Sequence, residues 1–94
     1  MLTEYEQEIC FLLLLNWSFK QIAEFMNYYR PLQQPRSLDT IIKKKNYICS
    51  KLRLPTNLLS DLQDFLVSIQ FHNKIPLSFL GFVIGTNTLR EISL

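Results

Sequence analysis

The chain has 94 residues, enough for one domain, and 48% of them are hydrophobic, so it can build a modest core. Charged residues make up only 19%, which argues against an intrinsically disordered chain. The formal net charge is +2.

This small net charge conceals a strong segregation along the chain. Residues 1–29 carry a net charge of −3, and residues 54–94 carry −1. Residues 30–53 hold seven basic side chains against one acidic side chain, a net charge of +6. Positive charge gathered in one short stretch is typical of a surface that meets a polyanion such as nucleic acid.

The first predicted helix begins at Thr3, whose side chain can cap it, and Glu6 completes a capping box three residues later. Its second half, residues 9–15, is apolar nearly all round, so we expect it to lie at the centre of the fold. Asn16 is the expected end, because asparagine tolerates the left-handed conformation. The apolar run is too short to span a bilayer.

A second helix begins at Ser18, with Gln21 in the capping-box position. Its predicted apolar stripe consists of Ile22, Phe25 and Met26. Residues 28–36 are predicted to form a connector, because prolines 31 and 35 lack an amide donor and restrict the residue before them.

Ser37 is predicted to cap a third helix that Pro55 ends. One face of this helix is expected to face the core: Leu38, Ile41, Ile48, Cys49 and Leu52. Polar side chains lie mostly away from that face: Lys43, Lys44, Asn46, Tyr47 and Lys51.

A fourth helix is predicted over residues 57–71, from apolar residues at helical spacing. The sequence therefore predicts an all-α fold of four helices, followed by an apolar C-terminal tail over residues 72–94.

No catalytic or metal-binding constellation is evident. Cys10 and Cys49 belong to no CxxC pair, so we expect buried free thiols, and His72 stands alone. Asp61 and Asp64 lie one helical turn apart, a spacing that usually marks a solvated face. We find no set of nucleophile, base and orienting group, and therefore expect neither an enzyme nor a cofactor.

Taken in order, four motifs over residues 2–69 resemble the LuxR-type helix-turn-helix domain. They are Leu2-Thr3-x-x-Glu6-x-Glu8-Ile9-x-x-Leu12-Leu13, Ser18-x-Lys20-Gln21-Ile22-Ala23, Thr40-Ile41 and Ile48-x-x-Lys51-Leu52. The resemblance implies a four-helix DNA-binding domain over residues 1–71, of the kind that ends many bacterial transcription regulators. It also implies a cytoplasmic, nucleoid-associated location.

The chain departs from this family in three places. Asn16 stands where the family usually has glycine, and Ile42-Lys43 stands where the family shows a lysine and then a variable residue. The turn before the third helix is about eight residues longer than the short turn of such motifs. Sigma-factor region 4 has a related helix pattern, but the fourth helix and the Lys51-Leu52 ending favour the LuxR type.

The resemblance implies that the third helix enters the DNA major groove. Its base-reading residues would be Ile42, Lys43 and Asn46, which suit a thymine methyl, guanine and adenine respectively. The remaining implied residues would contact phosphates: Ser18, Lys20, Gln21, Arg36, Thr40, Lys44, Tyr47 and Lys51. The alternative is that the lysine run is only a solvated face.

Dimerisation is the role that the resemblance and the apolar stripe suggest for the fourth helix. The interface would comprise Leu58, Leu62, Phe65, Leu66 and Ile69, with the tail of residues 72–94 beside it. The alternative is that this stripe closes the core of one chain. Expected partners are double-stranded DNA and a second copy of the chain. A larger regulator or RNA polymerase is a further candidate partner, and no association with a membrane is expected. A competing function is a protein-interaction module that heterodimerises with a full-length regulator and inhibits it.

Overall fold

The structure is a computed structural model that describes residues 2–29, 36–71, 76 and 79. Four helices are present in the described part: α1 (Glu4–Leu14), α2 (Phe19–Tyr29), α3 (Leu38–Lys51) and α4 (Leu59–Ser68). No strand occurs among the described residues, so the predicted all-α class with four helices is confirmed.

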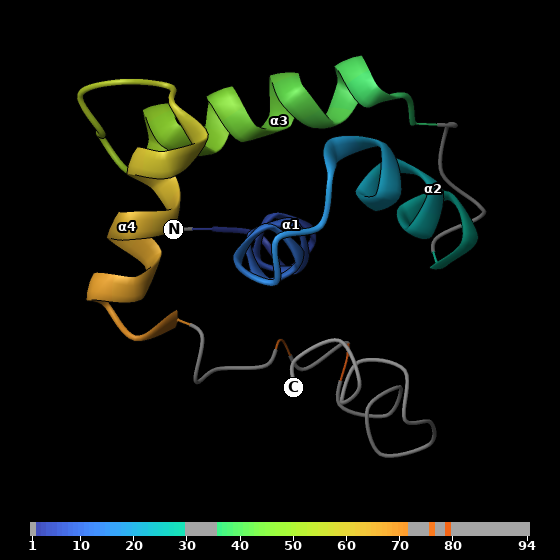
Figure 1. The fold of residues 1–94 in the computed structure, drawn as a ribbon, viewed down its shortest axis with the longest axis horizontal. Coiled ribbons are helices and arrows are strands. Elements are labelled where there is room, and N and C mark those ends of the chain that lie inside the picture. Colours follow the sequence, from blue (N-terminus) through green and yellow to red (C-terminus); the bar gives the residue numbers. More distant parts are fainter. Residues whose placement is uncertain (1, 30–35, 72–75, 77–78, 80–94) are drawn as a thin grey trace.

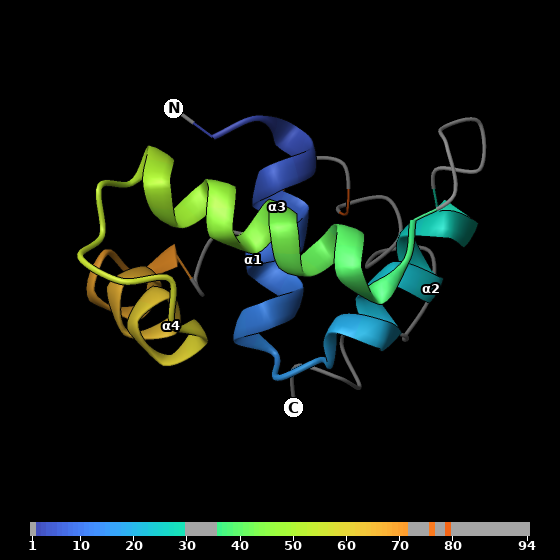
Figure 2. The same ribbon diagram turned by 90° about the horizontal axis from the view of Figure 1, so that it is seen from above.

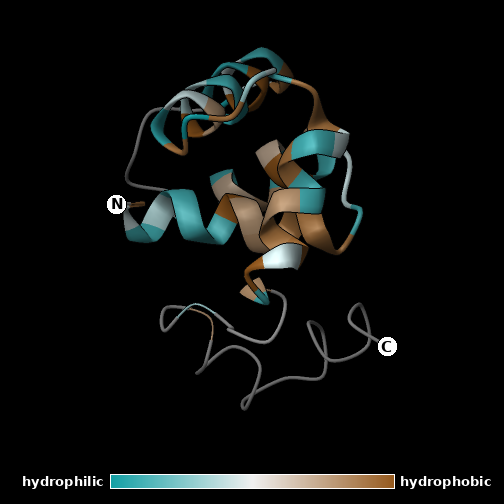
Figure 3. Cartoon of the chain, turned by 90° about the vertical axis from the view of Figure 1, so that its left-hand side faces the viewer, coloured by the Kyte–Doolittle hydropathy of each residue, from teal (hydrophilic) through white to brown (hydrophobic). Residues whose placement is uncertain are grey.

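Helix α1 lies at the centre, with α2 and α4 on opposite sides of it and α3 crossing over it (Figures 1 and 2). Its first turns are hydrophilic and its second half is hydrophobic (Figure 3). Residues 9–13 are all buried, as their apolar pattern predicts. The other helices complete the core with these buried side chains: Ile22, Ala23, Met26, Ile41, Ile48, Cys49, Leu62 and Leu66.

Both predicted boundaries of α1 are confirmed. The amide of Thr3 donates to Glu6 Oε1 at 2.8 Å, and the amide of Glu6 donates to Thr3 Oγ1 at 3.2 Å, which together make the capping box. Asn16 has a φ angle of 64°, in the left-handed region that reverses the chain after a helix.

The second capping box is also present. The amide of Ser18 donates to Gln21 Oε1 at 2.9 Å, and the amide of Gln21 donates to Ser18 Oγ at 3.1 Å. However, α2 continues through Tyr28 and Tyr29, which the sequence analysis placed in the connector. That prediction was wrong because a proline restricts only the residue directly before it, and Pro31 is two residues beyond Tyr29.

The start of α3 is tied directly to α2. The amide of Arg36 donates to Asn27 Oδ1 at 2.7 Å, and Asn27 Nδ2 donates to the carbonyl of Arg36 at 2.8 Å. The next residue, Ser37, accepts the amide of Thr40 at 3.2 Å and caps α3 as predicted. These contacts fix where α3 begins, while residues 30–35 of the connector lie outside the described residues.

Helix α4 is shorter than the predicted span of residues 57–71. It starts after Leu58, whose amide donates to Thr56 Oγ1 at 3.2 Å, and the chain turns at Gln70, with a φ angle of 59°. On α4, Gln63 Nε2 donates to the carbonyl of Leu13 at 2.9 Å. This carbonyl also accepts the amide of Asn16 at 3.0 Å, so the Gln63 bond is a second one to the same oxygen, and it ties the two helices together.

The core also includes one residue from the predicted tail. Phe79 is fully buried, with its ring centroid 6.0 Å from those of Phe11 and Phe25 and 5.2 Å from that of Tyr29. Apart from Pro76 and Phe79, the expectation for residues 72–94 lies outside the described residues. Within the described chain, no helix has the length and apolar character needed to cross a membrane.

Candidate nucleic-acid interface

The outward side of α3 carries a row of exposed polar residues. Thr40, Lys43, Tyr47 and Ser50 follow one another at spacings of three and four, which places them on one face of the helix. Ile41 and Ile48 on the opposite face are fully buried. We call these four exposed residues the α3 stripe; hydroxyl and ammonium groups make all of them hydrogen-bond donors.

Lys43 is the cation of the α3 stripe. Its side chain is 77% exposed, and its Nζ lies 3.2 Å from an Asp39 carboxylate oxygen one turn earlier. An exposed ion pair at this spacing stabilises a helix by only about 0.5 kcal/mol or less. Lys43 can therefore exchange Asp39 for another anion or acceptor at little cost.

Lys44 and Lys51 point toward α1 and share a buried carboxylate. Lys51 Nζ donates to Glu6 Oε1 at 2.8 Å, and Lys44 Nζ lies 3.7 Å from Glu6 Oε2. The Glu6 side chain is only 2% exposed, whereas those of Lys44 and Lys51 are 30% and 24% exposed. We call these three residues the Glu6 cluster. Two positive charges against one negative charge leave the cluster with one excess positive charge.

The ring of Tyr47 lies over this cluster. Lys44 Nζ is 5.1 Å from the ring centroid and Lys51 Nζ is 5.5 Å from it, both within the range of cation–π attraction. Tyr47 itself remains 53% exposed. The excess charge of the cluster therefore sits directly beneath an accessible phenol of the α3 stripe.

The Glu6 carboxyl is kept ionised by its surroundings. Burial by itself would raise its pKa, but the hydrogen bonds from Lys51 and from the amide of Thr3, with the charges of Lys51 and Lys44, lower the pKa below its usual value. The carboxylate that caps α1 is thus also the counter-ion of α3.

The third lysine of the run, Lys45, is buried and donates from Nζ to the carbonyl of Asn57. It holds the loop between α3 and α4 against the helix. The three adjacent lysines thus have three different surroundings: Lys43 faces solvent, Lys44 faces a buried carboxylate, and Lys45 is enclosed.

Arg36, predicted as a phosphate contact, lies in the interior. Its side chain donates from Nε to Tyr5 Oη at 2.8 Å and from Nη1 to the carbonyl of Met26 at 3.2 Å. Its guanidinium carbon is 4.8 Å from the Tyr5 ring centroid, and the residue is 8% exposed. These contacts give Arg36 a structural role between α1, α2 and the start of α3.

Two of the predicted base-reading residues, Ile42 and Asn46, are only partly exposed. Asn46 Oδ1 is buried and has no hydrogen-bond partner in the described part of the chain. A paired contact with adenine uses both the oxygen and the nitrogen of an asparagine amide. In the observed conformation Asn46 does not present that oxygen, whereas the Lys43 side chain is exposed to solvent.

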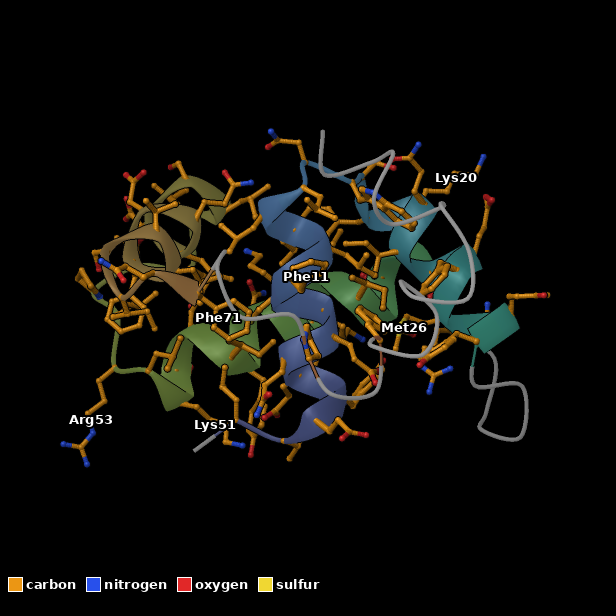
Figure 4. The ribbon with its side chains drawn as sticks, turned by 90° about the horizontal axis from the view of Figure 1, so that it is seen from below. Phe11, Lys20, Met26, Lys51, Arg53 and Phe71 are labelled. Atoms are coloured by element: carbon orange, nitrogen blue, oxygen red, sulfur yellow. The ribbon has the colours of Figure 1, made fainter. Side chains whose placement is uncertain are left out.

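The remaining predicted phosphate contacts lie at the start of α2. Lys20 is exposed there, at the opposite end of the molecule from Arg53 (Figure 4). Ser18 and Gln21 are also exposed, and each uses a side-chain oxygen in the capping box. The hydroxyl and the amide nitrogen remain as donors toward solvent.

The predicted dimer residues on and beside α4 fall into a buried group and an exposed group. Leu62 and Leu66 are fully buried, and Phe65 packs against the core, so these three close the core of the single chain. Leu58 and Ile69 are 60% and 47% exposed. Sequence reasoning missed Val67, which is 52% exposed and adds to the apolar surface of α4.

Two other residues and one ion-pair cluster were not predicted from the sequence. Ser50 lies three residues after Tyr47, so the helical spacing already contained the signal that places it on the stripe. Arg53 is exposed with a φ angle of 57°, at the turn after α3. No local sequence pattern indicates the pairing of Glu6 with Lys44 and Lys51, because up to 45 positions separate the partners.

The two cysteines are buried and free, as expected. Burial, with the nearby Glu6 charge, raises the pKa of Cys10 to about 12, and burial also raises the pKa of Cys49. Both thiols are therefore protonated and unreactive near neutral pH. Among the described residues, no group of histidine, cysteine and acidic side chains gathers to hold a metal ion.

Comparison with known proteins leaves the family open. No protein-family model matches the chain, no curated protein matches its sequence, and no solved structure matches its fold.

Proposed function

We propose that this protein is a sequence-specific regulator of transcription that binds double-stranded DNA with the outward face of α3 in the major groove. The observation that carries the proposal is the α3 stripe, an accessible row of donors on a helix whose other face is anchored in the core. Donors on a rigid helix are what base edges and phosphates require.

The dimensions of the stripe suit this role. From Thr40 to Ser50 the helix rises about 15 Å, at 1.5 Å for each residue. A major groove about 12 Å wide admits one α-helix. Lys43 lies in the N-terminal half of α3, the part of a recognition helix that contacts base edges.

The charge around α3 also supports the proposal. Residues 37–53 contain five basic side chains and one acidic side chain, and Glu6 offsets one further positive charge. The surplus attracts phosphates, and binding would release condensed counterions.

A LuxR-type helix-turn-helix domain is the form that we propose for this regulator, with a bacterial cytoplasmic location at the nucleoid. Its long connector is compatible with this form, because Asn27 holds Arg36 and thereby fixes the first residues before α3. Extra residues between those two points need not change how α3 is presented.

The proposal is tested by fluorescence anisotropy of a labelled random duplex pool, titrated with the protein from low to physiological salt. We expect binding that weakens steeply as salt rises. Sequences selected from the bound fraction should share a motif. Absence of binding even at low salt would refute the proposal.

Variants sharpen this test. Lys43→Gln should weaken specific binding by about 1–3 kcal/mol and relax one base position, whereas Lys20→Gln should weaken all sequences equally and reduce the salt slope by about 1. The matched control is Arg53→Gln, which removes the same charge outside the proposed contacts. Equal losses for all three variants would show that net charge alone, and not the α3 stripe, governs binding.

A second candidate function rests on α4. Its exposed Leu58, Val67 and Ile69 would suit association with another copy or with a larger regulator, as an inhibitor would require. Val67→Asp tests this without disturbing the core, and it should convert a dimer to a monomer in sedimentation velocity. An unchanged sedimentation coefficient would rule out this surface as the interface.

A further inference from the structure

We infer that a groove on α2 binds the cationic side chain of an arginine or lysine presented by a partner protein. In the part of the chain that the structure describes, this α2 groove is lined by Trp17, Gln21, Glu24, Phe25 and Tyr28. The groove is separate from the α3 stripe, and of its lining residues Gln21 alone is also a predicted phosphate contact.

The groove follows from the helical spacing of α2. Gln21, Glu24, Phe25 and Tyr28 lie three and four residues apart, so they share one face of the helix, and Trp17 joins them from the turn before α2. Phe25 on this face also packs on Phe79 in the core. In Figure 1, α3 lies above α2.

Ring contacts hold the walls of the groove in place. The Trp17 and Phe25 rings meet edge to face with centroids 5.3 Å apart, and Phe25 stacks on Tyr29 at 5.4 Å. Phe79 lies behind both, in the core. The aromatic surface is therefore preformed, which lowers the entropy lost when a ligand binds.

The chemistry of the groove favours a cation. The faces of tryptophan, tyrosine and phenylalanine attract ammonium and guanidinium groups. Among the described lining residues, Glu24 alone is charged, and it is exposed. No ion pair involves Glu24 among the described residues, although Lys20 lies one turn before it.

The same carboxylate disfavours nucleic acid at this site. A base stacked on Tyr28 would bring its phosphate near Glu24, where like charges repel. A guanidinium, in contrast, can stack on an aromatic face and donate two hydrogen bonds to one carboxylate. Charge complementarity therefore selects a basic protein segment, and among basic residues it favours arginine over lysine.

The test uses the fluorescence of Trp17, which is the only tryptophan of the chain and lines the groove. The full-length protein is titrated with the peptide acetyl-Gly-Arg-Gly-amide, and in parallel with acetyl-Gly-Gln-Gly-amide. We expect a saturable change in Trp17 emission with the arginine peptide and none with the glutamine peptide. A linear response, or equal responses to both peptides, would overturn the proposal.

Two groove variants and one control variant locate the effect. Glu24→Gln should weaken binding of the arginine peptide about tenfold, because it removes the charged acceptor. Asp64→Asn removes the same charge from exposed α4 and should leave the affinity unchanged. Tyr28→Ala, at a residue 76% exposed, should weaken binding without unfolding the chain, as circular dichroism would check. Equal affinity in wild type and Glu24→Gln would refute the role of this groove.

Discussion

The two faces of α3 use the same residue types for opposite purposes. On the inward face, Lys44 and Lys51 meet the buried carboxylate of Glu6, and Lys45 meets a backbone carbonyl. On the outward face, Lys43 is 77% exposed and pairs with a neighbouring aspartate on its own helix. A count of positive charges in this segment therefore overstates how many of them can meet DNA.

The difference teaches how a lysine is assigned to structure or to binding. When a cation breaks its ion pair with a buried counter-ion, that counter-ion remains unpaired in the interior, and this costs several kcal/mol. A cation can break its ion pair with an exposed partner at almost no cost in free energy. Burial of the partner, more than the charge itself, separates the inward face from the outward face.

The largest effect is expected from Arg36→Ala. The change removes donors to Tyr5 Oη and to the carbonyl of Met26, so we expect the free energy of unfolding to fall by about 3 kcal/mol. Urea denaturation measures it, with Lys20→Ala at an exposed helix position as the near-neutral control. A loss as small as that of the control would show that Arg36 is not part of the structural framework.

Glu6→Gln should follow, with a loss of about 2 kcal/mol. Glutamine keeps the capping box, so the variant isolates the negative charge that Lys44 and Lys51 share. The exposed Glu24→Gln is the matched control in the same denaturation experiment. Equal stability of the two variants would contradict the assignment of Glu6 as a structural counter-ion.

Lowering the pH should remove the same stabilisation of the fold by the Glu6 carboxylate. Because the pKa of Glu6 is lowered in the fold, its stabilisation is complete above the usual carboxyl pKa near 4.5 and is lost as the pH falls through the lower folded value. The urea midpoint should therefore drop between pH 5 and acid pH more steeply in wild type than in Glu6→Gln. Parallel pH profiles would show that Glu6 does not contribute.

The smallest changes in the free energy of unfolding are expected from replacing one lysine on each face of α3. Lys51→Gln should cost about 1 kcal/mol, because it removes a charged hydrogen bond to Glu6 that is only partly exposed. Lys43→Gln should change stability by less than about 0.5 kcal/mol while it weakens DNA binding. Denaturation and anisotropy on the same two proteins provide the measurement. The reverse order of stability losses would overturn the division between inward and outward lysines.

Much of the fold was predictable because its signals are local. The capping residues Thr3, Ser18 and Ser37, the left-handed Asn16 and the apolar second half of α1 all act within one or two helical turns. The boundaries of α2 and α4 were less accurate. Tyr28 and Tyr29 remain helical, and α4 ends at Ser68, because proline and apolar spacing only bound a helix loosely.

The site was predictable only in part, for the same reason. Helical phase placed Lys43 and Tyr47 on the exposed side of α3, and it would also have placed Ser50 there. It could not show that Arg36 and Lys45 are buried, because their partners are backbone carbonyls and a distant tyrosine. Nor could it separate Leu62 and Leu66 in the core from Leu58 and Ile69 on the surface.

The sequence by itself thus determined the helices, their caps and the concentration of positive charge, since all three depend on neighbours along the chain. Only the tertiary structure decided which cations are available. Glu6 lies 45 positions before Lys51, and their contact exists only because α3 crosses over α1. Burial of that carboxylate fixes two lysines inward and leaves Lys43 to face solvent.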